Sequence, residues 1–560
     1  MPDRQPGPLD ADLEALAAAH FESLVERRPV AATFLGRHDR DDRLGDISRA
    51  AADQDADEAR SYIGALEALD EAGLSAAAAF ERDIALWQAR KDLFMTAELR
   101  AWERRPAAID EIGDGLFSLF SRDFAPLSER LESIAGRLEE APRVLSQQPD
   151  VLRGQRVARW DVLELESSRQ LPIFFDEIAA AAHRTWSEGD ARQRRLRAAI
   201  AGAREALTTY EAWVGGSIDP DADGFALGSE AYDELVALRA FDGLTTDDIL
   251  EIGEAQLAEQ RAARVAVATE IDPAASEAEV LDRVKSDHPA SFEDALEEYR
   301  VAMFRARDHL VERDLVTIPD GERLEVIATP EYLRNVMPFA AYFDPPRFDR
   351  DPTGVYIVTP SVDGDPAAMR EHNRASISNT SIHEAFPGHH LQLTAAITHP
   401  SLIRAIADAP EFTEGWGMYS EQVMREQGFD DAAPFRLMLH TDAIWRACRI
   451  ILDVRLHRGE MSVAEAIDFL VGHTGFERAN AVAEVERYTS TPTYQLSYLL
   501  GKVMILRLRD DERRRLGSGF SLKGFHDALI YAGSLPVSFH RRLLAGEGPG
   551  PAVPRPLPGR

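Results

Sequence analysis

The strongest constraint on the fold is a helical spacing of apolar residues that runs through more than half of the chain. From about residue 10 to residue 314, apolar side chains recur three and four positions apart, as in Leu13, Phe21 and Leu24. Such a stripe marks the buried side of an amphipathic helix. Proline and glycine predict breaks between helices at Arg28-Pro29, Arg105-Pro106, Gln148–Asp150, Ser217–Gly224 and Ile271–Pro273. We therefore predict a mainly α fold.

Between about residues 320 and 360 the spacing changes to that of strands. Residues 323–328 alternate, and the β-branched residues 354–360 end at a proline, which is typical of an edge strand. Residues 338–346 indicate a turn-rich link. We predict a small antiparallel β-sheet next to the helix that carries the candidate metal ligands. Its edge strand could hold an extended peptide, or the sheet could serve packing alone.

Composition changes little along the 560 residues, which favours one large helical body with a deep cleft over separate domains. Within one continuous structural unit we expect an N-terminal helical region at 1–315 and a catalytic region at 316–545. Residues 546–560 are so rich in proline and glycine that we expect a disordered tail.

The formal charge of −33 excludes most nucleic-acid binding, because such an acidic surface repels phosphate backbones. The N-terminus has no apolar core of signal-peptide length, and no run approaches about 18 apolar residues. We therefore expect a cytoplasmic protein without membrane contact. The sequence leaves the oligomeric state open.

The residues with the clearest chemistry are His383, Glu384, His389 and His390. In the common zinc-peptidase helix two histidines stand four positions apart, but here Pro387 occupies that position. Proline lacks the N–H that would bond to residue 383, so the helix must widen or break. Gly388 supplies the backbone freedom for this deviation. If the two extra residues bulge outward, His389 takes the place that a histidine four positions after His383 would occupy. His390 would lie about 10 Å along an unbroken helix and is the reserve ligand or an outer-shell residue.

Glu414 follows His389 by 25 residues, which allows a second helix to supply a third ligand. Glu421, two turns further on the same face, could orient a ligand imidazole through its second nitrogen. Glu414 could instead be an acid favoured by the helix dipole. We predict that His383, His389 and Glu414 bind one Zn²⁺ ion.

The remaining assignments concern catalysis and substrate binding. Glu384, beside a ligand, is the predicted general base for zinc-activated water. Tyr498 is the first candidate for a donor to the oxyanion and Tyr488 the second. Arg487 or Lys502 could hold a substrate carboxylate. The tyrosines could instead be packing residues, and Glu384 could be a solvated glutamate on the helix surface.

These motifs resemble the bacterial domain-of-unknown-function family 885, a group similar to zinc metallopeptidases with a glutamate ligand. The resemblance is carried by Arg28–Gly36, His383–Gln392, Glu414–Glu421, Pro492–Tyr498 and Gly501-Lys502. It implies a helical fold with a deep cleft and a metal-dependent hydrolase role. The chain departs from the family pattern at Thr493 and Tyr494, where glycine and glutamine are expected.

The sequence therefore predicts a zinc-dependent hydrolase that cleaves amide bonds of short peptides, since a helical cleft would exclude folded proteins. Two alternatives remain open. One is a zinc amidohydrolase acting on a modified amino acid or a secondary metabolite, and the other is a non-catalytic helical scaffold.

Overall fold

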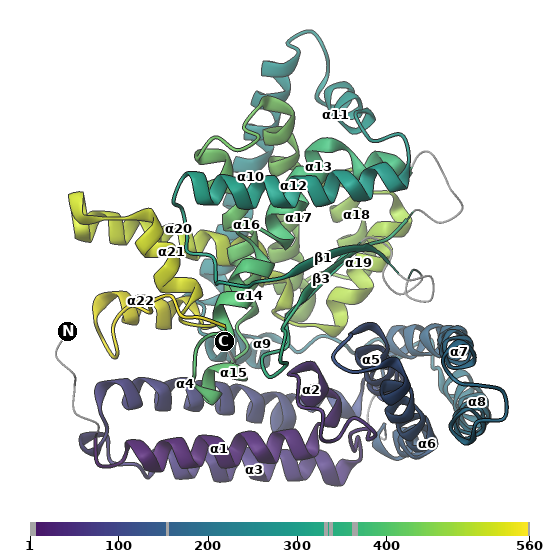
Figure 1. The fold of residues 1–560 in the computed structure, drawn as a ribbon. Helices are drawn as coiled ribbons and strands as arrows, with labels where there is room; N and C mark the ends of the chain where they lie inside the picture. The colour runs from purple at the N-terminus through teal and green to yellow at the C-terminus, as the bar shows by residue number, and fades with distance from the viewer. Residues whose placement is uncertain (1–6, 153–155, 330–333, 335–339, 361–367, 558–560) are drawn as a thin grey trace.

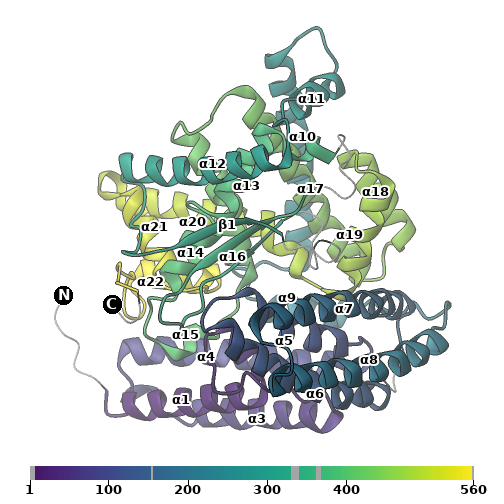
Figure 2. The same cartoon turned by 45° about the vertical axis from the view of Figure 1, so that its right-hand side comes forward.

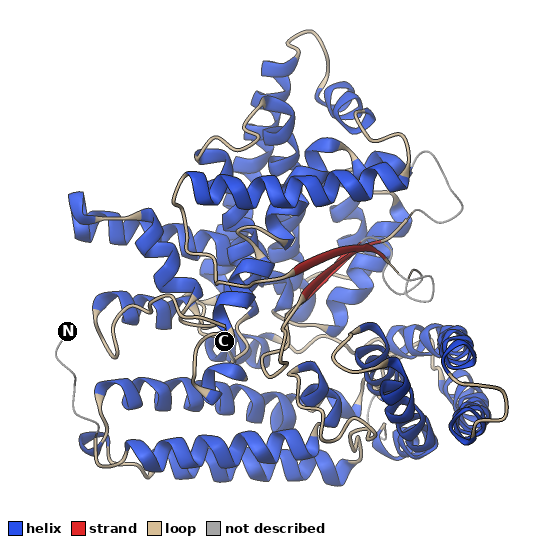
Figure 3. Ribbon diagram, viewed as in Figure 1, coloured by secondary structure: helices blue, strands red, loops and turns tan. Residues whose placement is uncertain are grey.

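The computed structural model describes residues 7–152, 156–329, 334, 340–360 and 368–557. Helices make up most of this part of the chain, and the strands form one small sheet (Figure 3). The prediction of a mainly α fold with a small sheet is confirmed. The deep cleft stays a prediction.

The N-terminal helices begin at proline or polar caps in several places. Their bounds are α1 Asp10–Arg27, α2 Pro29–Phe34, α3 Arg49–Glu67, η1 Glu71–Gly73, α4 Ala76–Leu93, η2 Phe94–Leu99, η3 Ala101–Glu103, α5 Ala108–Ser121, α6 Leu127–Val151, α7 Ala158–Thr185 and α8 Ala191–Ser217. Pro29 occupies the first position of α2, where its missing N–H costs nothing. The side chains of Ser48 and Ser75 cap α3 and α4.

The break predicted at residues 148–150 is wrong, because α6 continues through Pro149 to Val151. Buried side chains of α6, among them Val144 and Leu145, belong to one core with α5, α7 and α8. A proline inside a helix costs about 3 kcal/mol, and this packing offsets it.

The second half of the chain is also helical apart from three strands. The bounds are α9 Ser229–Leu238, α10 Thr246–Ile271, α11 Glu277–Ser286, α12 Phe292–Glu312, β1 Leu324–Ala328, β2 Ala340–Phe343, β3 Gly354–Val358, η6 Ala368–His372, α13 Arg374–Glu384, α14 His389–Ala396, α15 Leu402–Ala405, α16 Pro410–Glu426, α17 Ala433–His457, α18 Val463–Thr474, α19 Arg478–Ser490, η7 Tyr494–Leu496, α20 Ser497–Leu516, η8 Gly517–Gly519, α21 Leu522–Ile530 and α22 Val537–Ala545.

The helices are arranged in two layers. Figure 1 shows α1–α8 below a larger body built from most of the later helices, and Figure 2 shows the same division after rotation. The largest apolar core lies in the upper body and includes residues from Val157 to Val537. It therefore joins segments from both sides of the boundary expected near residue 315.

The sheet is mixed, with strand order β1-β3-β2, so the prediction of an antiparallel sheet is wrong. β1 pairs with β3 in parallel, Val326 opposite Tyr356, whereas β2 pairs with β3 in antiparallel orientation. β2 comes before β3 in the chain, but β3 lies between β1 and β2 and is therefore the central strand. Residues 354–360 are thus not an edge strand, and part of the predicted turn-rich link forms β2.

Alternate residues of β3 face different cores. Tyr356 and Val358 belong to the upper core, whereas Ile357 belongs to the core of α5–α8 and Val355 packs against it. The sheet is therefore buried between the two layers, which explains why its central strand is almost wholly apolar.

Residues 546–557 of the expected tail have no helix or strand. Leu557 is nevertheless only 2 % exposed, and Ala552 packs against the core that contains α1 and α4. The described part of this segment is therefore in contact with the body.

Candidate metal centre

The histidine motif lies where one helix ends and another begins. α13 ends at Glu384, and α14 starts at His389, so the helix breaks at the turn that contains Pro387. The predicted disruption is confirmed. Both His383 and His389 are more than nine-tenths buried, one at each side of the break.

Gly388 makes this break compact. Its N–H donates to the carbonyl oxygen of Ile382 at 3.0 Å, so the chain folds back on the end of α13. A Cβ atom at this position would overlap the carbonyl oxygen of His383. Only glycine permits this approach. Trp416 of α16 secures the same turn, because its indole Nε1–H donates to the carbonyl oxygen of Pro387 at 2.8 Å.

Two glycines of α16 bring that helix close to its neighbours. A Cβ at Gly417 would lie 2.7 Å from Cε1 of His383, so the absence of a side chain leaves room for the imidazole. A Cβ at Gly415 would lie 2.5 Å from the carbonyl carbon of Gly501 in α20. Gly415 and Gly501 together let α16 and α20 cross with their backbones in contact.

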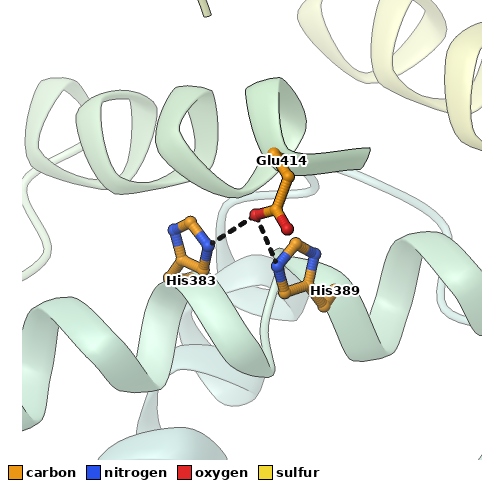
Figure 4. A group of neighbouring side chains, drawn as sticks. All are labelled: His383, His389 and Glu414. Atoms are coloured by element: carbon orange, nitrogen blue, oxygen red, sulfur yellow. Dashed lines mark ion pairs between the residues drawn. The ribbon is translucent and has the colours of Figure 1, made fainter. Parts of the chain in front are cut away.

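Figure 4 shows Glu414 of α16 pointing between the two imidazoles. Its Oε2 lies 3.6 Å from Nε2 of His383 and 3.3 Å from Nε2 of His389. The three ligand atoms lie within 4.8 Å of one another. In a tetrahedral zinc site with bonds of about 2.0–2.1 Å, ligand atoms lie about 3.3 Å apart. The chemistry and spacing of this triad therefore fit a zinc ion.

Glu421 holds His383 from the opposite side. Nδ1–H of His383 donates to Oε1 of Glu421 at 2.7 Å, and Nδ2 of Asn379 donates to Oε2 at 3.1 Å. This bond leaves Nε2 as the nitrogen that faces Glu414. His389 has no equivalent support, because its buried Nδ1 has no hydrogen-bond partner among the described residues.

The charges within the triad favour a cation. Burial lowers the pKa of His383, but hydrogen bonds with Glu414 and Glu421 outweigh burial and raise it to about 10. Burial would raise the pKa of Glu414, but the charge of His389 and the hydrogen bond of His383 hold it well below its usual range. A divalent ion between these side chains would displace the proton of the imidazole and would itself supply the positive charge that stabilises the Glu414 carboxylate.

Tyr494 is a contact of the triad that the sequence did not predict. Its hydroxyl donates to Oε1 of Glu414 at 3.0 Å. The preceding Thr493 has φ +66°, a left-handed conformation that glycine adopts more easily. The backbone N–H of Thr493 donates to Asp453 at 2.9 Å, and Arg239 donates to its hydroxyl at 3.1 Å. These bonds hold the threonine where the family pattern predicts glycine.

Glu384 and His390, which each follow a candidate ligand in the sequence, have different surroundings. Glu384 follows His383 at the end of α13, and its carboxylate accepts no hydrogen bond from any described residue. His390 points away from the triad. Its Nδ1 lies 3.0 Å from the hydroxyl of Tyr342 and its Nε2 lies 2.9 Å from Glu322, so it links α14 to the sheet instead of contacting a ligand.

Tyr488, the second candidate for the oxyanion donor and thus a predicted contact of the substrate, is fully buried, and its hydroxyl already has three partners. Trp445 and Arg449 each donate to it at 3.1 Å, and it donates to Glu484 at 2.7 Å. Arg487 pairs with the same glutamate at 2.9 Å. The structure therefore gives both predicted substrate-binding residues partners within the protein.

Tyr498, the predicted oxyanion donor, lies closer to the triad. Its ring packs edge-on against that of Tyr494, with 6.0 Å between centroids, and Arg449 lies 4.6 Å over it. Burial and the charge of Glu414 raise the pKa of Tyr498, so its hydroxyl keeps its proton at neutral pH. Lys502 is buried in α20, and burial lowers its pKa.

A cavity of about 320 Å³ reaches the triad at Glu414, beside Tyr494. Its walls come from α14, α15, the start of α16 and the segment after β2. The candidate metal centre thus has an adjoining space that can hold a small molecule.

The profile of a family described as bacterial proteins of unknown function, DUF885, matches residues 29–544. The chain belongs to the DUF885 family. No curated protein matches this DUF885 chain. None of its described helices has the length and apolar content needed to cross a bilayer.

Two solved structures resemble this DUF885 protein over nearly their whole length. One is a candidate lipoprotein of unknown function from Shewanella oneidensis, with a TM-score of 0.79, 21 % identity, and coverage of 95 % of this chain and 99 % of its own. The other is a candidate lipoprotein from Colwellia psychrerythraea, with a TM-score of 0.81, 18 % identity, and coverage of 95 % and 98 %. At these identities the similarity shows a common fold.

Proposed function

We propose that this DUF885 protein is a zinc-dependent hydrolase that cleaves amide bonds in short peptides. The proposal rests on one observation: two buried imidazoles and one carboxylate from three helices converge at the spacing of zinc ligands. The proposed similarity to zinc metallopeptidases with a glutamate ligand rests on the same convergence of two imidazoles and one carboxylate. A cytoplasmic location stays a prediction.

In this proposal His383, His389 and Glu414 hold the ion, and Glu421 fixes the orientation of His383. When bound, zinc would polarise the scissile carbonyl and lower the pKa of the attacking water to about 7. Glu384 accepts the proton of that water and returns it to the leaving amine. Its carboxylate is available for this role because no described residue donates to it.

The surroundings of the triad support a small substrate. The adjoining cavity of about 320 Å³ lies at the lower end of the range for ligand pockets, which suits a peptide of a few residues. Tyr498, with its proton retained at neutral pH, would donate a hydrogen bond to the developing oxyanion.

The variant Glu384→Gln tests the proposed base. We expect it to bind zinc like the native protein, because the ligands are intact, and to lose about 10²- to 10⁴-fold in kcat. Hydrolysis of dipeptides and zinc content would be measured on the same preparations, so that loss of the ion cannot explain loss of activity. Native kcat in a fully zinc-loaded variant would rule out the role of Glu384.

A further inference from the structure

The cavity beside the triad follows one face of α14. Leu393 and Ile397 line it, and they stand four and eight positions after His389. Residues at this spacing lie on one side of a helix. At 1.5 Å per residue, Ile397 is about 12 Å along the axis from His389. The cavity therefore has one end at Glu414 and another near the C-terminus of α14.

Arg347 lines this cavity and is 8 % exposed, yet its guanidinium has no hydrogen bond or ion pair with any residue that the structure describes. Arg404, which also lines the cavity, is different. It lies 2.6 Å from Glu81 and donates to the carbonyl oxygen of Ala532 at 2.7 Å. Arg347 is thus a largely buried cation in the cavity wall, with its Cζ 5.6 Å from the ring centroid of Phe348. Asp344 and Asp408 line the same cavity but form no ion pair with it.

Arg347 lies in the segment after β2. The N–H of its neighbour Phe348 donates to the carbonyl oxygen of Leu35, just after α2. Burial, followed by the charges of Arg404, Arg555 and Arg347, lowers the pKa of His399 to about 2. His399 follows α14, so these cations gather near the C-terminal end of that helix.

A buried charge without a partner is costly, and an anion that enters the cavity would remove that cost. The planar guanidinium group matches a carboxylate in a bidentate geometry. With ends about 12 Å apart along α14, the cavity suits a short peptide that has its scissile amide at the triad and its C-terminal carboxylate one or two residues further on.

Building on the proposed function, we propose that Arg347 binds the free C-terminal carboxylate of a short peptide whose scissile amide lies at His383, His389 and Glu414. The substrate class is then small peptides with an unblocked C-terminus. Arg347 takes the role that the sequence had suggested for Arg487 or Lys502.

Calorimetry with trialanine and its C-terminal amide, which are long enough to reach from the triad toward Arg347, tests this inference. The ligands are titrated into Glu384→Gln protein, in which turnover is suppressed, both zinc-loaded and after chelation. We expect the acid to bind about 10- to 100-fold more tightly than the amide, as for a charge-assisted hydrogen bond. Adding Arg347→Leu should abolish this difference in both metal states. The matched change Arg350→Leu, at an exposed arginine in the same loop, should preserve it.

The two proposals fail separately. Equal affinity for acid and amide would overturn the role of Arg347, whatever the zinc content. A protein that prefers the acid but never binds zinc would overturn the proposed hydrolase and support the role of Arg347.

Discussion

At the scale of single residues, the best-defined group is His383, which has a carboxylate near each ring nitrogen. Glu421 accepts from Nδ1 at 2.7 Å, and Nε2 lies 3.6 Å from Glu414. A carboxylate on the remote nitrogen fixes the tautomer and makes the other nitrogen a better ligand. Asn379 extends this support to a further residue of α13.

Glu421→Gln should weaken zinc binding by about 10- to 100-fold, because a neutral amide orients His383 but no longer increases its basicity. Competition with a chromogenic chelator measures the affinity. Glu426→Gln is the control on the same helix, since that carboxylate pairs with Arg509 at 2.8 Å. Equal zinc affinity in native protein and Glu421→Gln would contradict a supporting role for Glu421.

Some contacts of the candidate site depend only on how far apart two residues lie in the sequence, and these contacts can be predicted from the sequence. His383 and His389 flank a proline turn, and Glu421 lies two turns beyond Glu414 on one helix. Tyr494 was not predicted as a contact, because its place depends on how α20 crosses α16. Asn379, one turn before His383 on the same face, could have been found from its spacing.

At the scale of elements, the turn between α13 and α14 sets the position of His389. Gly388 allows the turn to approach the backbone of residues 382 and 383, and no larger residue fits there. Trp416 ties the turn to α16, the helix that carries Glu414. The geometry of the triad therefore depends on the packing of backbone segments as well as on the ligands.

Gly388→Ala should destabilise the protein by about 1–3 kcal/mol, as expected for overpacking against rigid backbone, and should weaken zinc binding. Denaturant unfolding and zinc titration measure the two effects. Gly64→Ala is the control, because this glycine lies within α3 and a Cβ there meets no atom within 4 Å. It should be neutral or stabilising by up to about 1 kcal/mol. If both variants retain native stability and zinc affinity, the tight turn is not required.

The sheet shows where sequence patterns fail at this scale. The β-branched residues 354–360, which end at a proline, predict an edge strand, yet β3 is central and buried on both faces. Periodicity identifies a strand but not its neighbours, which depend on the long connection that contains β2. The helix break wrongly predicted at Pro149 has a similar cause, since tertiary packing overrides a local preference.

At the scale of the whole molecule, the triad lies in the upper body and its cavity extends to α2 of the lower layer, through Phe34 and Leu35. Helices α13, α14 and α16 supply the ligands, and the same large core surrounds all three. The centre is therefore preorganised by the fold, which the two structural relatives share over nearly the whole chain.

Metal analysis of the purified protein after zinc exposure and removal of excess ion tests the central claim most directly. The account predicts about one zinc ion per chain in the native protein, and strongly reduced zinc in His389→Ala, which loses one ligand of the triad. His372→Ala is the matched control and should retain the ion, because this histidine contacts Tyr299 at 3.3 Å instead of the triad. Native protein without bound zinc, or equal zinc in His389→Ala, would contradict the account.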